Sequence, residues 1–87
     1  MEKEAQYLYD MIKPIVANPE SVEVEQITDE RGILLSLKLA KEDVGSIIGK
    51  GGEMARAIRK VVRLFGIIND KRISIKIIEP EHGDNKL

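Results

Sequence analysis

One segment, residues 44–52 (VGSIIGKGG), constrains the fold of this chain more than any other part of the sequence. An aliphatic run ends there in glycines around a lysine, and residues 53–66, which follow, have the periodicity of a helix. Glycine lacks a Cβ, so the main chain can turn tightly and a ligand can come close to its peptide groups. The free N–H groups and the positive dipole end at a helix start favour an anion. We therefore expect a tight turn between two helices that holds a phosphate group, with Lys50 at its tip.

Three types of glycine-rich phosphate-binding loop differ in their spacing. A P-loop requires G-x-x-x-x-G-K followed by Ser or Thr, but Gly45 precedes Gly49 by four positions and Gly51 follows the lysine. A dinucleotide-binding fingerprint would need a glycine where Met54 stands and a strand before the loop. The remaining pattern is G-x-x-G, Gly49-Lys50-Gly51-Gly52, between two helices. KH domains hold about four nucleotides of single-stranded RNA with such a loop.

Hydrophobic periodicity predicts the elements before the loop. Apolar residues at three- and four-residue spacing mark an amphipathic helix over 3–17, which Pro14 should kink near Asp10. A half-exposed strand begins at residue 22, and its phase slips before Ile27, which indicates a bulge there. The other predicted elements are a hairpin turn over 29–32, a strictly alternating strand over 33–40, a short helix over 42–48, the helix over 53–66 and a strand over 73–77. Gly66 should end its helix as a left-handed cap.

The order helix, strand, strand, helix, helix, strand and the residues around the loop resemble the KH family. The resemblance runs from Val44 through Arg59 and includes residues 40–45 (AKEDVG). The chain as a whole resembles the small bacterial single-KH proteins of the KhpA/YlqC type, with matches at Lys13-Pro14, Asn18-Pro19-Glu20, Glu42-Asp43-Val44-Gly45 and Ala57-Ile58-Arg59. This resemblance implies an α+β protein with the type II KH fold, three helices on one face of a three-stranded sheet. We assign one domain to residues 1–80 and a polar tail to 81–87.

Charge is distributed unevenly in a chain whose net charge is only −1. Residues 1–40 carry four basic and eight acidic side chains, net −4, whereas residues 41–63 carry six basic and three acidic ones, net +3. The positive charge therefore lies on the segment that contains the loop, as phosphate binding requires. The chain has no cysteine, no long apolar run and no paired nucleophile and base. We expect a cytoplasmic, non-catalytic protein with no metal, cofactor, membrane contact or small-molecule substrate.

The helix over 53–66 has two distinct faces. At 100° per residue its predicted core face consists of Met54, Ile58, Val61, Val62 and Phe65, and a basic stripe of Arg56, Arg59, Lys60 and Arg63 lies opposite. The KH resemblance makes Arg59 a candidate for base edges, because relatives often place a basic side chain in this third turn and a guanidinium can bind bidentately. We expect Lys60 and Arg63 to be solvated.

Base stacking cannot dominate binding, because Tyr7, Tyr9 and Phe65 are the only aromatic residues. The KH resemblance implies instead an aliphatic groove for the bases, formed by the helix before the loop and the strand over 33–40. The predicted RNA-binding residues are Gly45, Ser46, Ile48, Gly49, Lys50, Gly51, Gly52, Arg56 and Arg59.

Partners follow from the family resemblance. It implies a larger KH protein of the Jag type as heterodimer partner, or a homodimer, and a post-transcriptional or RNA-chaperone role linked to cell elongation and cell wall homeostasis. Leu64, Ile67 and Ile68 could form an association patch, but we expect them to close the core. The alternative function is a protein-interaction subunit that binds RNA weakly or not at all. It is favoured by the acidic N-terminal half and by Glu53, whose carboxylate competes with phosphate at the helix start.

Overall fold

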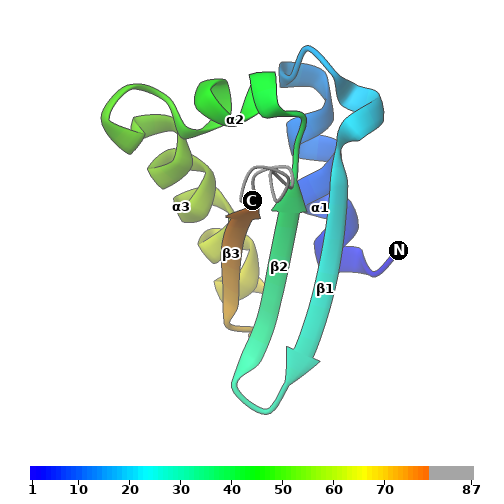
Figure 1. Ribbon diagram of the computed structural model, residues 1–87. Helices are drawn as coiled ribbons and strands as arrows, with labels where there is room; N and C mark the ends of the chain where they lie inside the picture. The colour runs from blue at the N-terminus through cyan, green and yellow to red at the C-terminus, as the bar shows by residue number, and fades with distance from the viewer. Residues whose placement is uncertain (79–87) are drawn as a thin grey trace, which may run out of the picture.

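The computed structural model describes residues 1–78, and the tail predicted for 81–87 lies outside the described residues. Figure 1 shows the order of the elements, with the β1–β2 hairpin at one end of the molecule and the α2–α3 turn at the other. The helices and strands are α1 (Lys3–Ile12), β1 (Glu23–Asp29), β2 (Gly32–Lys38), α2 (Lys41–Ile48), α3 (Glu53–Ile68) and β3 (Ile73–Ile78). Short 3-10 turns cover Lys13–Ile15, Pro19–Ser21 and Lys50–Gly52.

The sheet has the strand order β1-β2-β3, with β2 antiparallel to β1 and parallel to β3. The strand with the strictest alternation is the central one, and its residues Ile33, Leu35 and Leu37 are buried. All three helices contribute to the core around these side chains. The core residues of the helices are Ala5, Leu8 and Ile12 from α1, Val44 and Ile47 from α2, and Ile58 and Val62 from α3. The predicted α+β architecture, a type II KH fold, is therefore confirmed.

The predicted helix over 3–17 is too long. α1 ends at Ile12, and Pro14 lies in a 3-10 turn, after which Val16 is extended. Proline has no N–H to donate to the carbonyl of Asp10, so the chain leaves the helix here instead of kinking through it.

The bulge predicted before Ile27 is also wrong. Pairing between β1 and β2 continues without interruption from Glu23↔Lys38 to Asp29↔Gly32. The apparent change of phase arises because a polar residue, Gln26, occupies an inward position opposite Leu35. A half-buried amide that points inward is tolerated when its hydrogen bonds are made, and Gln26 makes several.

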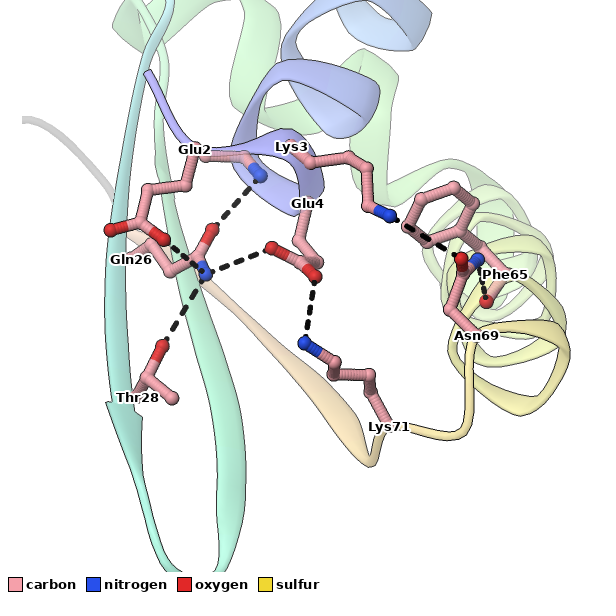
Figure 2. A network of polar contacts seen from close by, with 9 residues as sticks. Glu2, Lys3, Glu4, Gln26, Thr28, Phe65, Asn69 and Lys71 are labelled. Atoms are coloured by element: carbon pink, nitrogen blue, oxygen red, sulfur yellow. Dashed lines mark hydrogen bonds and ion pairs between the residues drawn. The ribbon is translucent and has the colours of Figure 1, made fainter.

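Figure 2 shows this network, which joins α1, β1 and the connection between α3 and β3. The Gln26 side chain accepts a hydrogen bond from the Ala5 N–H at 3.0 Å and donates one to the buried Glu4 carboxylate at 3.1 Å. Lys71 Nζ lies 3.7 Å from the other Glu4 oxygen. The bond from Gln26 lowers the pKa of Glu4, with burial acting in the opposite direction. The network therefore holds the connection after α3 against the N-terminal helix.

Gly66 is not the left-handed cap that the sequence suggests. α3 continues through it to Ile68, and the positive φ in this region, 58°, belongs to Asp70. A Cβ on Gly66 would lie 2.6 Å from the Lys71 carbonyl oxygen and 3.1 Å from Ile73 Cγ1. The glycine is needed because the chain returns across the helix at this point.

Candidate functional site

The predicted turn between two helices is present at residues 49–52. Gly49 ends α2 with φ 77°, and its N–H donates to the Gly45 carbonyl at 2.8 Å. Gly51 and Gly52 follow with φ 63° and 76°. A Cβ on Gly49 would lie 2.7 Å from Met54 Cβ, so both its backbone angle and its close packing require glycine.

The loop leads directly into the start of α3, where no side chain caps the helix. The Gly52 and Glu53 N–H groups already donate to the Gly49 and Lys50 carbonyls, so the helix dipole and the remaining N–H groups of the first turn make this end suitable for an anion. Lys50 is exposed at the turn, and Arg56 Nη1 donates to the Gly51 carbonyl at 3.0 Å, which places that guanidinium against the loop. Glu53, exposed in the first turn, has the opposite charge. The local cations therefore outnumber the single carboxylate.

α2 presents a bare surface beside the loop. Val44 and Ile47 are buried, whereas Gly45 and Ser46 are exposed and Ile48 is half-buried. A Cβ on Gly45 would meet nothing within 4 Å, although glycine inside a helix costs about 1 kcal/mol relative to alanine. No packing contact requires glycine here, so its presence is consistent with a surface that a ligand approaches closely.

The base groove predicted between α2 and the strand over 33–40 stays a prediction. β2 is the central strand, so one of its faces is covered by the helices and the other points away from them. The sheet edge beside α3 belongs to β3, and a hollow of about 650 Å³ lies between this strand and α3. It is lined by Arg59, Arg63, Ile67, Lys71, Arg72 and Ile73 to Ile75.

The hollow contains one predicted site residue, Arg59, and several that the sequence did not indicate. Arg63, expected to be solvated, lines it one helical turn further along. Arg72 and Ile75 come from a distant part of the chain, and only the strand order reveals that they face the same helix.

The aromatic residues are used within the fold. Tyr7 from α1 and Phe65 from α3 stack with ring centroids 4.2 Å apart at an angle of 14°, and Lys13 Nζ lies 5.1 Å from the centroid of Tyr9. Tyr7 and Phe65 therefore pack on each other, and the expectation that base stacking does not dominate stays a prediction.

Asp43 positions α2, a role that the sequence did not reveal. Its buried carboxylate accepts hydrogen bonds from the Ala17 N–H at 2.9 Å, the Asn18 N–H at 3.0 Å and Asn18 Nδ2 at 3.2 Å. The bond from Ala17, together with those from Asn18, holds the pKa of Asp43 below its ordinary value, although burial opposes the shift. α2, and with it the glycine loop, is therefore attached to the segment that follows α1.

We expect Asp43→Asn to lower the urea midpoint at pH 7, because the new amide can accept fewer hydrogen bonds from the three donors. Because the pKa of Asp43 is lower in the folded protein, its carboxylate stabilises the fold at pH values above the pKa of Asp in the unfolded chain, about 3.9. This stabilisation is lost as pH falls through the folded pKa. The urea midpoints of wild type and variant should therefore come closer together below about pH 4. If the two midpoints differ by the same amount at pH 7 and at low pH, the charge of Asp43 is unimportant for stability.

α3 carries a second, exposed apolar face. Met54, Ala57, Val61, Leu64 and Ile68 are all exposed and recur at alternating spacings of three and four residues. The predicted core face was therefore wrong at Met54 and Val61, and the core positions of α3 are Ala55, Ile58, Val62 and Gly66. Ile67 and Ile68 are each 72% exposed and Leu64 56%, so these residues do not close the core. We call Met54, Ala57, Val61, Leu64 and Ile68 the α3 stripe.

Within residues 1–78, no helix is long and apolar enough to cross a membrane. In the same range, no three His, Cys, Asp or Glu side chains are grouped so that they could hold a metal ion.

Comparison with known proteins agrees with this architecture. The family model described as KhpA/KhpB, KH domain matches residues 5–77. The chain is 41% identical over 73 residues to the RNA-binding protein KhpA of Clostridium acetobutylicum, covering 84% of this chain and 97% of that protein. It is 39% identical over 72 residues to the KhpA of Listeria monocytogenes, covering 83% and 95% of the two chains. The KhpA of Streptomyces coelicolor is 33% identical over 75 residues, covering 86% and 91%. With the G-x-x-G turn, the helix pair and the mixed sheet in place, the chain belongs to the KhpA/KhpB family of KH domains.

Proposed function

We propose that this protein is a non-catalytic, single-stranded RNA-binding module. The observation that carries the proposal is the positive-φ glycine turn that opens directly onto the uncapped start of α3, with Lys50 and Arg56 beside it. It is supported by its relatives, which are named RNA-binding proteins.

In this proposal the loop holds the sugar-phosphate backbone. Phosphate oxygens accept from the loop and helix-start N–H groups, and Lys50 and Arg56 supply charge. Unstacked bases then lie beside the loop, between the bare surface of α2, formed by Gly45, Ser46 and Ile48, and the part of α3 up to Arg59. Arg59, which also lines the hollow between α3 and β3, reaches the base edges.

Arg59→Ala tests this arrangement. A base-edge contact should cost about 1 to 3 kcal/mol on a preferred RNA sequence and much less on a poor one, whereas a phosphate contact would weaken both alike. Preferred sequences are first selected from a random pool with the wild-type protein, and affinities are then measured by fluorescence anisotropy. If Arg59→Ala loses the same affinity for every RNA sequence, Arg59 does not contribute to sequence specificity. Failure of the wild type to select or bind any RNA would refute the RNA-binding function itself.

We propose, from the family resemblance, a cytoplasmic post-transcriptional regulator or RNA chaperone linked to cell elongation and cell wall homeostasis. Crosslinking and immunoprecipitation from cells would test this role, because it recovers bound RNA and bound protein together. Recovery of transcripts unrelated to envelope growth would contradict the physiological part of the proposal.

The proposal includes a second KH domain as partner, because about four nucleotides offer few contacts and a linked second site raises the effective concentration. The α3 stripe is the surface it would occupy, since apolar residues alternating three and four apart form the seam of paired helices. The partner is a larger Jag-type KH protein, as the family resemblance implies, or a second copy of this chain, which carries the same stripe.

Val61→Glu with Leu64→Glu places two carboxylates in the middle of this stripe without touching the buried positions of α3. Sedimentation velocity should show a dimer for wild type, or a complex once the larger KH protein is added, and a monomer for the variant. Affinity for a tetranucleotide should be unchanged. If the variant associates as well as wild type does, the stripe is not the interface.

A second candidate function is a protein-interaction subunit without RNA binding. The specific observation in its favour is the extent of the exposed stripe on the same helix whose first turn carries Glu53. This candidate predicts a stable complex with a protein partner and no measurable affinity for RNA.

A further inference from the structure

The hollow between α3 and β3 is strongly basic. Arg59, Arg63 and Arg72 line it together with Lys71, and Ile67, Ile73 and Ile75 supply apolar walls. Its volume of about 650 Å³ lies in the range typical of ligand sites. Four basic side chains therefore lie together here although the net charge of the chain is −1.

The three arginines are not neutralised within the fold. None of them forms an ion pair or a side-chain hydrogen bond with another residue in the range 1–78, whereas Lys71 is held by Glu4 at 3.7 Å. Asp29, which lines a neighbouring hollow with Arg72, is itself paired with Arg31 at 3.5 Å. Guanidinium groups that have no partner among residues 1–78 and lie in a concave, partly apolar site favour an anionic ligand that can accept their hydrogen bonds.

The far end of the hollow is fixed in place. Arg72 accepts a backbone hydrogen bond from the Ile33 N–H at 2.7 Å, and Lys71 N–H donates to the Gly66 carbonyl at 2.7 Å. The contacts of Lys71 with Glu4, and of Lys3 with Asn69 at 3.5 Å, join the same connection to α1 (Figure 2). A site held by several contacts loses little entropy on binding.

The hollow continues the proposed RNA surface. Arg56, Arg59 and Arg63 recur at spacings of three and four on one face of α3, so they lead from the glycine turn toward Arg72. Arg63 lies eleven residues after Gly52, a distance of about 16 Å along the helix axis at 1.5 Å per residue. An RNA strand held at the turn would pass this row if it extended along the helix.

We infer that Arg63 and Arg72 form a second phosphate-binding site, which takes the backbone of nucleotides beyond the four held by the loop. The inference rests on the proposed RNA-binding function and extends it. The bound RNA segment is then longer than the four nucleotides that one G-x-x-G turn holds. The additional affinity comes from electrostatic contacts to phosphates, which carry no sequence preference.

The test compares unstructured oligouridines of four, six and eight nucleotides, measured by fluorescence anisotropy at two or more salt concentrations. The variant is Arg63→Gln with Arg72→Gln, and the matched control is Lys60→Gln, which removes a basic side chain from the same helix outside the hollow. Circular dichroism and thermal melting check that each protein is folded. A longer strand also gains affinity from additional binding registers, but that gain persists in the variant.

We expect the variant to bind the tetranucleotide as wild type does and to lose about tenfold or more on the octanucleotide, with a shallower salt slope by about 0.7 for each lost phosphate contact. Lys60→Gln should leave the length dependence unchanged. Equal length dependence in wild type and variant, or an equal loss in the Lys60 control, would overturn the second site while leaving the loop function standing. A wild type that binds none of the oligonucleotides would overturn both.

Discussion

Replacing Lys50 and Gly51 together by Asp is expected to abolish RNA binding and to leave the fold intact. Both residues are exposed, and a Cβ on Gly51 would meet nothing within 4 Å. The φ of 63° at Gly51 is left-handed, a region in which Asp is several-fold enriched among non-glycine residues. A side chain at this φ is still strained, so the substitution should cost about 1 to 2 kcal/mol of stability, which the rest of the fold can absorb.

The electrostatic effect should be large. The change removes one positive charge and adds two negative charges where the phosphates are proposed to lie, within a Debye length of about 8 Å at physiological salt. The wild-type salt slope should be about −1.5 to −3, because roughly two to four phosphates are neutralised at about −0.7 each.

Filter binding or anisotropy measures the loss, with thermal melting as the folding control. Lys76→Asp is the matched variant, because it also reverses the charge of a lysine. Lys76 is exposed on β3, between Ile75 and Ile77, which pack on the core, so its side chain is on the face of the sheet that points away from the helices. If the double variant is folded and still binds RNA like wild type, the glycine turn does not hold the RNA backbone. The protein-interaction function would then be the better supported of the two.

The second large effect concerns stability. We expect Gly66→Ala to destabilise the fold by about 1 to 3 kcal/mol, the usual cost of overpacking. Alanine normally stabilises a helix relative to glycine, but here its Cβ would lie 2.6 Å from the Lys71 carbonyl oxygen. The connection to β3 would have to move, and the network that holds Lys71 would move with it.

Gly45→Ala is the matched substitution, because it also lies in a helix but has open space around its Cβ. It should stabilise the fold by about 0.5 to 1 kcal/mol. Urea unfolding of wild type and both variants measures the change in the free energy of unfolding that each substitution causes. If Gly66→Ala is as stable as wild type or more so, the close approach of the returning chain is not important for the fold.

Much of the functional loop could be predicted from sequence because its determinants are local. Glycines at fixed spacing between two amphipathic segments specify a turn at a helix start whatever surrounds them. Gly49, Gly51 and Gly52 accordingly have positive φ, and Lys50 is exposed. Which of these residues contact RNA is a proposal that the binding experiments decide.

The remaining errors come from contacts between distant parts of the chain. A helical angle plot cannot tell which apolar arc faces the core, so Met54 and Val61 were assigned to the interior although α3 buries Ala55 and Gly66. A polar residue at an inward position, Gln26, looks like a change of phase in the sequence and so predicts a bulge. Its hydrogen bond to Glu4, a residue far away in the sequence, explains why this side chain can face inward without one.

The order of the elements, the alternating strand over 33–40 and the glycine turn follow from local sequence, because hydrophobic period and glycine conformation act over a few residues. Tertiary packing places β2 at the centre of the sheet and β3 at the edge beside α3, brings Arg63 and Arg72 into one hollow, and makes Gly66 necessary for the returning chain. These features depend on how strands are ordered and helices are rotated against them. That arrangement is set by the packing of the whole core and not by any local pattern.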